Sequence, residues 1–443
     1  MKKGTNTLAI KMSIALVLGI LSGFLCIFLR ENWGVSSDSW KFLNFLLFQD
    51  IGAKGGEKAL GLFYIIGQLF INSLQLVIIP MVYTSITLAI CHISDTRKLG
   101  RISYKTLGFF LFSSVIALVL AGFVGMSLNV SGAFNIHIES GVNVVTGKTG
   151  SNPLLMIIQI VPNNIFSAFS KNGGVLATVF LAVSTGLCIN SFGERISYLK
   201  GLLQEINDIV ITFLTFVINK FGPIAIFVLL TRTFAAYGVE HLKPALIYVV
   251  STTLTLLLFL IFGYALLIVI STRLNPLPFV KKSAKVALFG FSTSSSAATL
   301  PLNKKTTVEE LGVNEDIASF VLPLGMTTNM NGTAIMQVIA AVFVASTAGY
   351  ELGISNIFII GILALIASVG TPAAPGAGAI VLFTILSGLG YVNDTAILTY
   401  SLILAINRPI EMLVTSLNVI GDSVASIYVA KSENMLDEDV YNK

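Results

Sequence analysis

Apolar residues run along this chain in long blocks that short polar and charged stretches separate. Blocks of about 20 apolar residues can cross a bilayer as helices. Such blocks cover residues 8–29, 59–93, 106–130, 202–230 and 244–270. The block 59–93 is too long for an upright crossing, so we expect it to be tilted or to extend beyond the membrane. A further block, 153–192, is interrupted by Pro-Asn-Asn and Gly-Gly and predicts a broken span.

The composition supports a polytopic membrane protein. Of the 443 residues, 55% are hydrophobic and 11% are charged, whereas a soluble protein carries roughly 25% charged residues. We interpret the net charge of +5 as loop charge that orients the chain in the membrane, and we expect no nucleic-acid partner. The three cysteines lie in or beside apolar segments without the spacing of metal ligands. No nucleophile–base pair or phosphate-binding loop is evident, so we do not expect an enzyme.

The distribution of lysine and arginine predicts the topology. Positive residues concentrate in the stretches 97–105, 195–200 and 273–285, which we therefore place in the cytoplasm. The connection 131–152 is polar with one lysine and is expected outside. This alternation puts both termini in the cytoplasm of a protein of the plasma membrane. The charged tail after residue 431 is expected to be frayed.

The pattern changes in the C-terminal half, where polar residues interrupt apolar segments at mid-depth. The stretches 291–301 (FSTSSSAATLP) and 370–378 (GTPAAPGAG) each have flanks too short to cross the membrane singly. They predict two re-entrant hairpins, and between them lies a helix broken at 326–333 (MTTNMNGT). Non-helical backbone at this depth is tolerated only where it is buried or lines a cavity. Interrupted segments in corresponding positions of two halves indicate a transporter site at the bilayer midplane.

A polar stripe follows in the stretch 405–422 (AINRPIEMLVTSLNVIGD). Glu411, Thr415, Asn418 and Asp422 are spaced 4, 3 and 4 residues apart and share one helix face. A charge at the bilayer centre costs roughly 2.5–3.5 kcal/mol on insertion scales, so this face avoids lipid. The stripe predicts the lining of an ion or solute pathway; the alternative is a set of hydrogen bonds between helices.

The end of the stripe suits a hard cation. Asp422 and Asn418, with backbone carbonyls from a predicted unwound segment at 325–329, form an oxygen-only ligand set, which favours Na⁺ over a transition metal. The alternative role of Asp422 is to cap a helix or to pair with a lysine. Glu411 is a candidate partner for a substrate amino group, or it pairs with Arg408 on the same face. The two roles of Glu411 could coexist.

The two interrupted tips offer groups for the rest of a substrate. The hydroxyls and amides of the tip at 294–299 could hold a carboxylate, or that tip is simply polar and flexible. Glycines 376 and 378 permit close backbone approach or act as hinges. An ion channel is the other class that such segments allow. The convergence of carboxylates and amides on a glycine-hinged site favours a transporter with alternating access.

At these residues the chain resembles the dicarboxylate/amino acid:cation symporter family, the glutamate-transporter group. Four stretches resemble the family's motifs, in the same order: the tip 291–301, NMNGT at 329–333, GTPAAPGAGA at 370–379 and NVIGD at 418–422. The resemblance implies an all-α membrane protein with eight transmembrane helices, two re-entrant helical hairpins and inverted repeats. It also implies a homotrimeric, elevator-type transporter that has a lipid bilayer and a small-molecule substrate as partners and uses Na⁺ without an organic cofactor.

The resemblance further implies a division of the chain. A fixed scaffold would comprise residues 1–105 (helices 1–2) and 131–235 (helices 4–5). A sliding transport domain would comprise helix 3 at 106–130 and residues 236–432, which hold helix 6, hairpin 1, helix 7, hairpin 2 and helix 8. Residues 433–443 would form a cytoplasmic tail, and the second hairpin would act as the gate.

Site residues carry over by position from the family. The first sodium site would use Gly325, Asn329, Asn418 and Asp422, and the second would use Thr327, Ser368, Val369 and Thr371. The third would use Phe110, Ser113, Ser114, Asn329 and Asn331. The substrate would contact Ser295, Ser296, Met330, Thr333, Ala374, Pro375, Gly378, Arg408, Glu411, Val414, Thr415 and Asn418.

Three departures from the family pattern change the expected chemistry. The family's signature Asp is Asn331 here, so we expect a weak or absent third site and fewer than three sodium ions per cycle. The Arg that holds the side-chain carboxylate of glutamate is Val414, and the Asp that steadies that Arg is Asn407. An unpaired Asp would be unfavourable without the Arg, so the two changes agree. We expect poor binding of aspartate and glutamate.

Glu411 stands where amino-acid carriers of the family keep an Asp for the substrate amino group. The Glu411 side chain reaches further than that of an Asp, so we expect a small ligand. Val414 beside it favours a neutral amino acid such as Ala, Ser, Thr or Cys. The alternative substrate is a C4-dicarboxylate or an acidic amino acid bound by Arg408, which the dicarboxylate branch also has. Glu411 would repel such a dianion.

Overall fold

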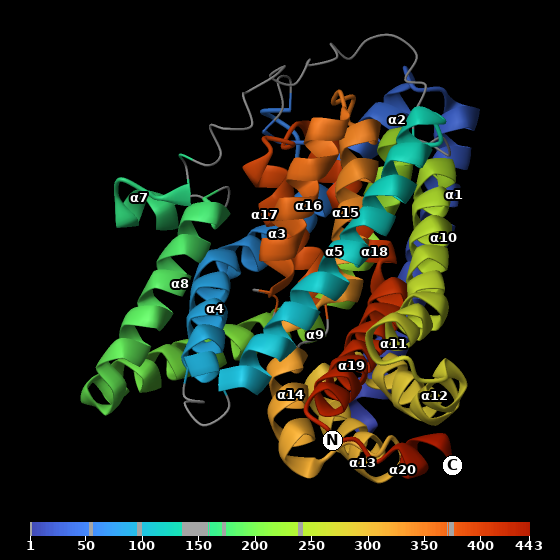
Figure 1. Ribbon diagram of the computed structural model, residues 1–443. Helices are drawn as coiled ribbons and strands as arrows, with labels where there is room; N and C mark the ends of the chain where they lie inside the picture. The colour runs from blue at the N-terminus through green and yellow to red at the C-terminus, as the bar shows by residue number, and fades with distance from the viewer. Residues whose placement is uncertain are drawn as a thin grey trace.

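The computed structural model describes residues 2–52, 56–94, 100–134, 158, 160–170, 174–237, 242–369, 371 and 376–443. These residues form a nearly all-helical protein (Figure 1), which confirms the expected helical class. Among them, seven segments are long and apolar enough to cross a membrane. They are Ile10–Trp33, Leu62–Cys91, Gly100–Val130, Ser197–Ala235, Lys243–Thr272, Glu315–Thr347 and Arg408–Ser432.

A first group of helices comes mainly from the N-terminal half. Its members are α1 (Lys2–Trp33), α2 (Asp38–Leu43), the π-helix η1 (Asn44–Phe48), α3 (Leu62–Leu76), α4 (Ile78–Ser94), α7 (Ile165–Phe169), α8 (Val175–Phe192), η2 (Gly193–Ile196) and α9 (Ser197–Tyr237). The long helix α9 packs along α1, α3 and α4, and α4 also packs on α8.

A second group contains α5 and most of the C-terminal half. Its members are α5 (Gly100–Val130), α10 (Leu242–Leu258), η4 (Phe259–Gly263), α11 (Tyr264–Thr272), α12 (Pro276–Thr293), α13 (Ser296–Glu309), α14 (Glu315–Thr328), α15 (Asn331–Thr347), α16 (Ile354–Val369), α17 (Ala377–Gly388), α18 (Asp394–Ile406), α19 (Arg408–Ser432) and α20 (Glu438–Asn442). Helices α15 and α19 form its centre. They pack on each other, and each of α5, α10, α12 and α14 packs on one or both of them.

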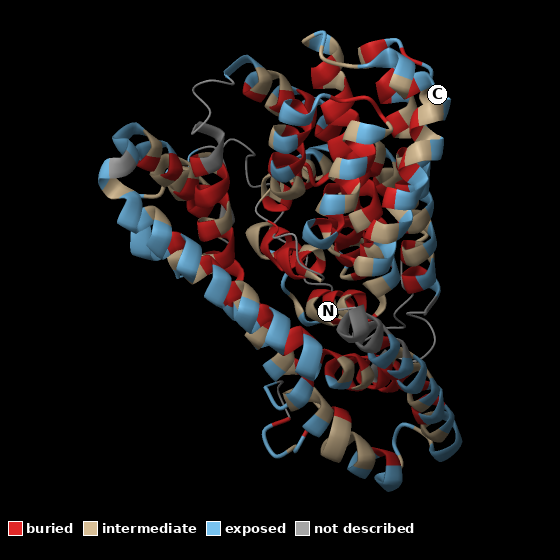
Figure 2. Ribbon diagram, turned by 90° about the horizontal axis from the view of Figure 1, so that it is seen from below, coloured by how far each residue is buried: buried red, intermediate tan, exposed pale blue. Residues whose placement is uncertain are grey.

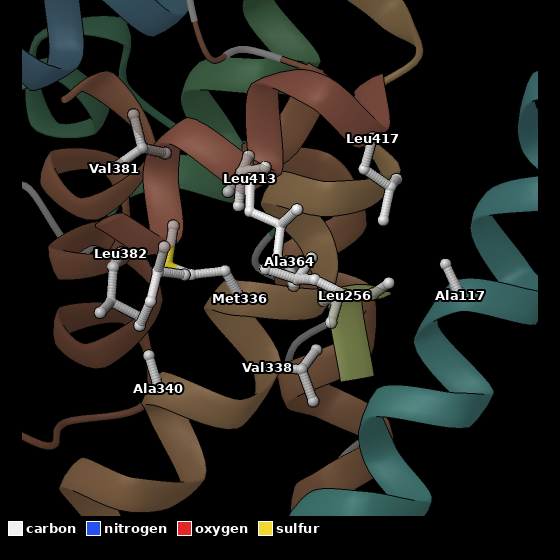
Figure 3. Packing of buried hydrophobic residues seen from close by; sticks show 14 of the residues in the cluster. Ala117, Leu256, Met336, Val338, Ala340, Ala364, Val381, Leu382, Leu413 and Leu417 are labelled. Atoms are coloured by element: carbon white, nitrogen blue, oxygen red, sulfur yellow. The ribbon is translucent and has the colours of Figure 1, made fainter. Parts of the chain in front are cut away.

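The hydrophobic core is densest in this second group. Figure 2 shows buried residues concentrated in its interior, whereas the long helices of the first group carry exposed residues along one side. Helix α15 is buried along almost its entire length. Figure 3 shows Met336 of α15 directed toward Leu382 of α17 within this core. A helix that is apolar on all sides is expected at such a position.

The predicted interruptions occur, but they are shorter than expected. Helices α12 and α13 pack on each other and are separated by Ser294, in the left-handed conformation, and Ser295, whose side chain caps α13 by accepting from the Ala298 amide. The interruption expected at 326–333 is confined to Asn329 and Met330. The prediction of unwound backbone from residue 325 was therefore wrong. The residues up to Thr328 stay helical because their amides still find intrahelical carbonyls.

Other predicted boundaries were also wrong. The expected loop that holds Arg101 and Lys105 is the first part of α5. The helix that carries the polar stripe is divided at Asn407, since Pro409 in the first turn of α19 cannot continue α18. Most of the expected external loop 131–152 lies outside the described residues.

The C-terminal tail is packed, so the expectation of a frayed tail was wrong. Tyr441 is 0% exposed and its hydroxyl donates to the carbonyl of Asn275, 2.9 Å away. Lys282 Nζ donates to three backbone carbonyls at 2.8 Å each, two of them in α20. Glu433 lies 2.5 Å from Lys105 of α5, and the hydrogen bond from that lysine holds the pKa of Glu433 below its ordinary value. The tail thus ties α19 to α5 and α12.

We predict that Tyr441→Ala destabilises the protein by about 3 kcal/mol, because the substitution removes a fully buried ring and its hydrogen bond. The measurement is thermal unfolding of the purified protein in detergent. Tyr198, which is 92% exposed, supplies the control: Tyr198→Ala is expected to change stability by less than about 0.5 kcal/mol. Equal effects of the two substitutions would show that the tail contributes nothing to stability.

Candidate ion and substrate site

Asp422 lies where α19 meets the break between α14 and α15. Its side chain is buried, at 2% exposed, and Oδ1 accepts a hydrogen bond from Asn329 Nδ2 at 2.9 Å. A Cβ at Gly325 would come within 2.4 Å of the same oxygen. Only a glycine at position 325 therefore lets the carboxylate approach the backbone of α14 this closely.

The surroundings of Asp422 fit a bound cation. Asn329 must turn Nδ2 toward the carboxylate, which only accepts, and its Oδ1 is then buried without a hydrogen-bond partner. In the described part of the chain, no lysine or arginine lies within ion-pair distance of Asp422. A buried carboxylate beside an unpartnered oxygen is unfavourable unless a cation neutralises it. An oxygen-only set suits a hard cation such as Na⁺.

The Gly325 carbonyl remains available as a further ligand. It accepts the last helical hydrogen bond of α14, from the Asn329 amide at 2.8 Å. It is thus not the free carbonyl that the sequence led us to expect. A carbonyl oxygen has two lone pairs, so one is left for a cation.

Asn418 connects α19 to the start of α15. Its Oδ1 accepts from the Gly332 amide at 2.8 Å, and its Nδ2 donates to Thr333 Oγ1 and to the Met330 sulfur, both at 3.2 Å. The structure therefore joins three predicted residues: Met330 and Thr333, expected at the substrate, and Asn418, expected at both the substrate and the first sodium site. Because Asn418 lies one turn from Asp422, this amide links the two candidate sites physically.

Glu411 lies at the other end of the stripe. It is 8% exposed, and its Oε1 accepts from the Ala379 amide in the first turn of α17, at 3.4 Å. Arg408 Nη1 lies 3.8 Å from Oε2, so the ion pair considered from the sequence is present. Arg408 Nε is buried without a hydrogen-bond partner. The Glu411 carboxyl group is thus held between a guanidinium group and the N-terminus of α17.

A small cavity of about 50 Å³ lies beside this pair. Its lining includes Gly376, Ala379, Arg408 and Glu411 on one side, and residues of α1, α3 and α9, such as Ile218, on the other. The polar end of the stripe therefore meets the boundary between the two groups of helices.

Val414 and Thr415 are placed differently along the stripe. Val414 is buried, and its backbone lies against Gly332 of α15. Thr415 is only half-buried, and its hydroxyl donates to the Glu411 carbonyl at 3.0 Å. Gly378 at the start of α17 packs against Thr333, since a Cβ there would come within 3.3 Å of the threonine methyl.

The first tip connects two helices, α12 and α13, that both pack on α19. Helix α12 packs closely on α19, where Gly290 contacts Ser416. Ser296 is buried and Ser295 is half-buried, and the Ser295 hydroxyl is engaged as the cap of α13. Ala374 and Pro375 of the second tip lie outside the described residues.

The residues predicted for the second sodium site lie on two neighbouring helices. Thr327 is on α14, Ser368 and Val369 end α16, and Thr371 follows them; α14 and α16 contact each other. The hydroxyls of Thr327, Ser368 and Thr371 donate to carbonyls of their own segments at 3.3, 2.9 and 2.9 Å. Each hydroxyl oxygen can still accept, but the arrangement contains no carboxylate.

The residues of the third predicted site are brought together around Asn331. Its Nδ2 donates to Ser113 Oγ at 3.0 Å and to the Tyr264 hydroxyl at 3.3 Å, while Ser114 Oγ donates to its Oδ1 at 2.6 Å. Phe110 is buried beside them on α5. The amide is therefore satisfied by protein groups on both sides and offers a cation no charge.

Two polar residues of this region were missed from the sequence. Gln337 lies on α15 and its Nε2 donates to the Gly378 carbonyl at 3.1 Å. Tyr248 on α10 donates to Asn407 Oδ1 at 2.7 Å. A glutamine within the apolar helix, one turn after Thr333, was the available signal for the first. For Tyr248 nothing local distinguishes it from other membrane tyrosines.

Comparison with known proteins gives a family model and many relatives. The model described as "Sodium:dicarboxylate symporter family" matches residues 8–432. A proton/sodium-glutamate symport protein of Geobacillus stearothermophilus is 28% identical over 412 residues, which cover 90% of this chain and 96% of that protein. C4-dicarboxylate transport proteins of Cupriavidus pinatubonensis and Deinococcus deserti are 30% and 28% identical; the matches cover 84% and 99% of this chain, and 86% and 92% of those proteins.

Proposed function

Because this chain belongs to the sodium:dicarboxylate symporter family, a family of transporters and not of enzymes, we propose that it is a symporter for a small neutral amino acid such as Ala, Ser, Thr or Cys, driven by sodium or proton entry. The observation that supports this substrate class is the buried carboxylate of Glu411, on α19, which contacts the first turn of α17. It can bind an ammonium group, and it would repel a second carboxylate.

The residue composition around Glu411 supports the same class. Val414 is buried and lies against Gly332, where it offers no positive charge to a substrate side chain. Glu411 and Arg408 already form an ion pair. A zwitterion can bind by replacing both partners: its ammonium group pairs with Glu411 in place of the guanidinium, and its carboxylate pairs with Arg408 in place of Glu411.

A second candidate is transport of a C4-dicarboxylate or an acidic amino acid. The relatives' names, glutamate and C4-dicarboxylate carriers, favour it. Within the structure it is favoured by Arg408, whose Nε is buried without a hydrogen-bond partner. A dianion would have to displace Glu411 from Arg408 and bury both carboxylates near it, which is unfavourable.

We propose that Na⁺ is held first by Asp422, with Asn329, Asn418 and the Gly325 carbonyl. A bound cation would supply the positive charge that the buried carboxylate lacks. Asn418 also contacts Met330 and Thr333 of the proposed substrate chamber. A bound ion that holds Asn418 in place therefore also positions substrate-binding groups. This contact is a physical route for coupling ion binding to substrate binding. The satisfied amide of Asn331 supports a weak third site and fewer than three sodium ions.

We also propose the architecture of eight transmembrane helices and two re-entrant hairpins, α12–α13 and α16–α17, in a homotrimer that works as an elevator. The two groups of helices support a scaffold at 1–105 and 131–235 and a transport domain at 106–130 and 236–432. Figure 1 shows the start of α1 and the end of the chain on the same side as α12–α14, which supports cytoplasmic termini in the plasma membrane.

Replacing Glu411 with Gln tests the proposed function. We expect Ala and Ser to bind about 10- to 100-fold more weakly, since a charged hydrogen-bond partner of the ammonium group is lost. The measurement is ligand-induced thermal stabilisation, with Ala, Ser, aspartate and succinate, in sodium and in choline. Glu309→Gln, at an exposed pair with Lys305, is the control. Full-strength binding of Ala by Glu411→Gln, or stabilisation of the wild type by succinate alone, would contradict the proposal.

A further inference from the structure

Gln337 carries a buried oxygen that no protein group satisfies. Its side chain is 0% exposed in the middle of the molecule. Nε2 donates to the Gly378 carbonyl at 3.1 Å, and Oε1 is buried without a hydrogen-bond partner. An unsatisfied buried acceptor is costly, so a donor from outside the protein is expected to meet it.

The orientation of this amide is fixed by its neighbour. The Gly378 carbonyl only accepts, so the side of Gln337 that faces it must be the amino group. Turning the amide over would place two acceptors against each other and leave both unsatisfied. The free atom is therefore an acceptor, and any group that binds it must donate.

Gln337 adjoins residues of the proposed amino-acid site through the start of α17. Thr333 lies one turn earlier on the same face of α15 and packs against Gly378. The Thr333 hydroxyl accepts from Asn418. The next residue after Gly378, Ala379, donates to Glu411. Successive residues at the start of α17 thus contact Gln337 and Glu411.

We propose that Gln337 Oε1 accepts a hydrogen bond from the side-chain hydroxyl of the substrate, so that the carrier prefers Ser and Thr to apolar amino acids of the same size. This inference rests on the proposed neutral amino-acid function. Glu411 takes the ammonium group, and Gln337 reads the side chain. A thiol donates weakly, so Cys ranks between Ser and the apolar analogues. A second substrate carboxylate only accepts hydrogen bonds, and Gln337 Oε1 also only accepts. Binding of a substrate with a carboxylate at this position would therefore be disfavoured.

Ligands that differ only by a hydroxyl in place of a methyl group test the proposal in the wild-type protein. We expect Ser to bind about 10-fold more tightly than 2-aminobutyrate, and Thr about 10-fold more tightly than Val, in sodium. The readout is the concentration that half-saturates thermal stabilisation. In Gln337→Met, which keeps the length and removes the acceptor, each ratio should fall to about 1, while affinity for Ala changes less than about 3-fold.

Control and contrary outcomes are separable. Gln204→Met, at an exposed position of α9, should leave both ratios unchanged. If the wild type binds Ala but does not distinguish Ser from 2-aminobutyrate, the role of Gln337 is wrong and the neutral amino-acid function stands. Ratios that persist in Gln337→Met lead to the same conclusion. If no neutral amino acid binds and succinate or aspartate does, both proposals are wrong. The wild-type ratios decide even if the variant fails to fold.

Discussion

Replacing Asp422 with Asn is expected to raise the sodium concentration required for half-maximal substrate binding at least about 100-fold. The substitution keeps the shape of the side chain and its contact with Asn329, but it removes the single carboxylate of the proposed first ion site. Loss of a charged ligand partner in a buried position costs about 3 kcal/mol, which corresponds to this factor. The measurement is sodium titration of substrate-induced thermal stabilisation.

The same variant separates an ion-binding role from a structural one. Without sodium, Asp422→Asn should be as stable as the wild type or more stable, because a buried carboxylate without a cationic partner has been removed. Asp316→Asn at the exposed start of α14 is the control. An unchanged sodium requirement in Asp422→Asn would exclude Asp422 as an ion ligand. A loss of stability in the absence of sodium would indicate a structural role.

The second large effect is a change of substrate class. In the double variant Val414→Arg with Asn407→Asp, we expect aspartate to bind at least about 100-fold more tightly than in the wild type, since a bidentate guanidinium group becomes available to its side-chain carboxylate. The Tyr248 hydroxyl, which donates to Asn407, can donate equally to an aspartate at 407. Binding of Ala and Ser should weaken.

Val414→Arg alone should be destabilised, because it introduces a buried charge without the acidic partner at 407. The measurements are binding of aspartate, Ala and Ser by competition, with thermal stability of both single variants as the reference. Val414→Leu, which adds volume without charge, is the matched control. If aspartate already binds the wild type as tightly as the double variant, Val414 does not set the substrate class.

The sequence predicted much of the C-terminal half because its signals are local. A polar interruption in an apolar segment costs free energy wherever the segment packs, so the breaks at Ser294–Ser295 and Asn329–Met330 could be expected without knowledge of their neighbours. The 4-3-4 spacing from Glu411 to Asp422 fixes a common helix face by geometry alone. The expectation that this stripe avoids lipid is met by the burial of α19.

The same reasoning failed where a distant partner decides. The charged tail has the composition of a frayed end, yet Tyr441 is buried because Asn275 and Lys282 offer it partners more than 150 residues away in sequence. The helical state of residues 325–328 could not be anticipated, since NMNGT shows that a break exists but not how many residues it takes. The contact of Glu411 with the Ala379 amide likewise depends on how α17 approaches α19.

By itself, the sequence determined that this is a helical membrane protein with interrupted segments, a polar stripe and the motifs of its family, because hydrophobic length, helical periodicity and motif order are properties of short stretches. Only the tertiary structure decided which polar atoms are satisfied. It shows that the side-chain amide of Asn331 is hydrogen-bonded to Ser113, Ser114 and Tyr264. Asn329 and Gln337, in contrast, each have a buried side-chain oxygen without a hydrogen-bond partner. The physical reason is that folding decides which hydrogen-bond partners reach a buried polar group. These partners lie on helices that are far apart in the sequence.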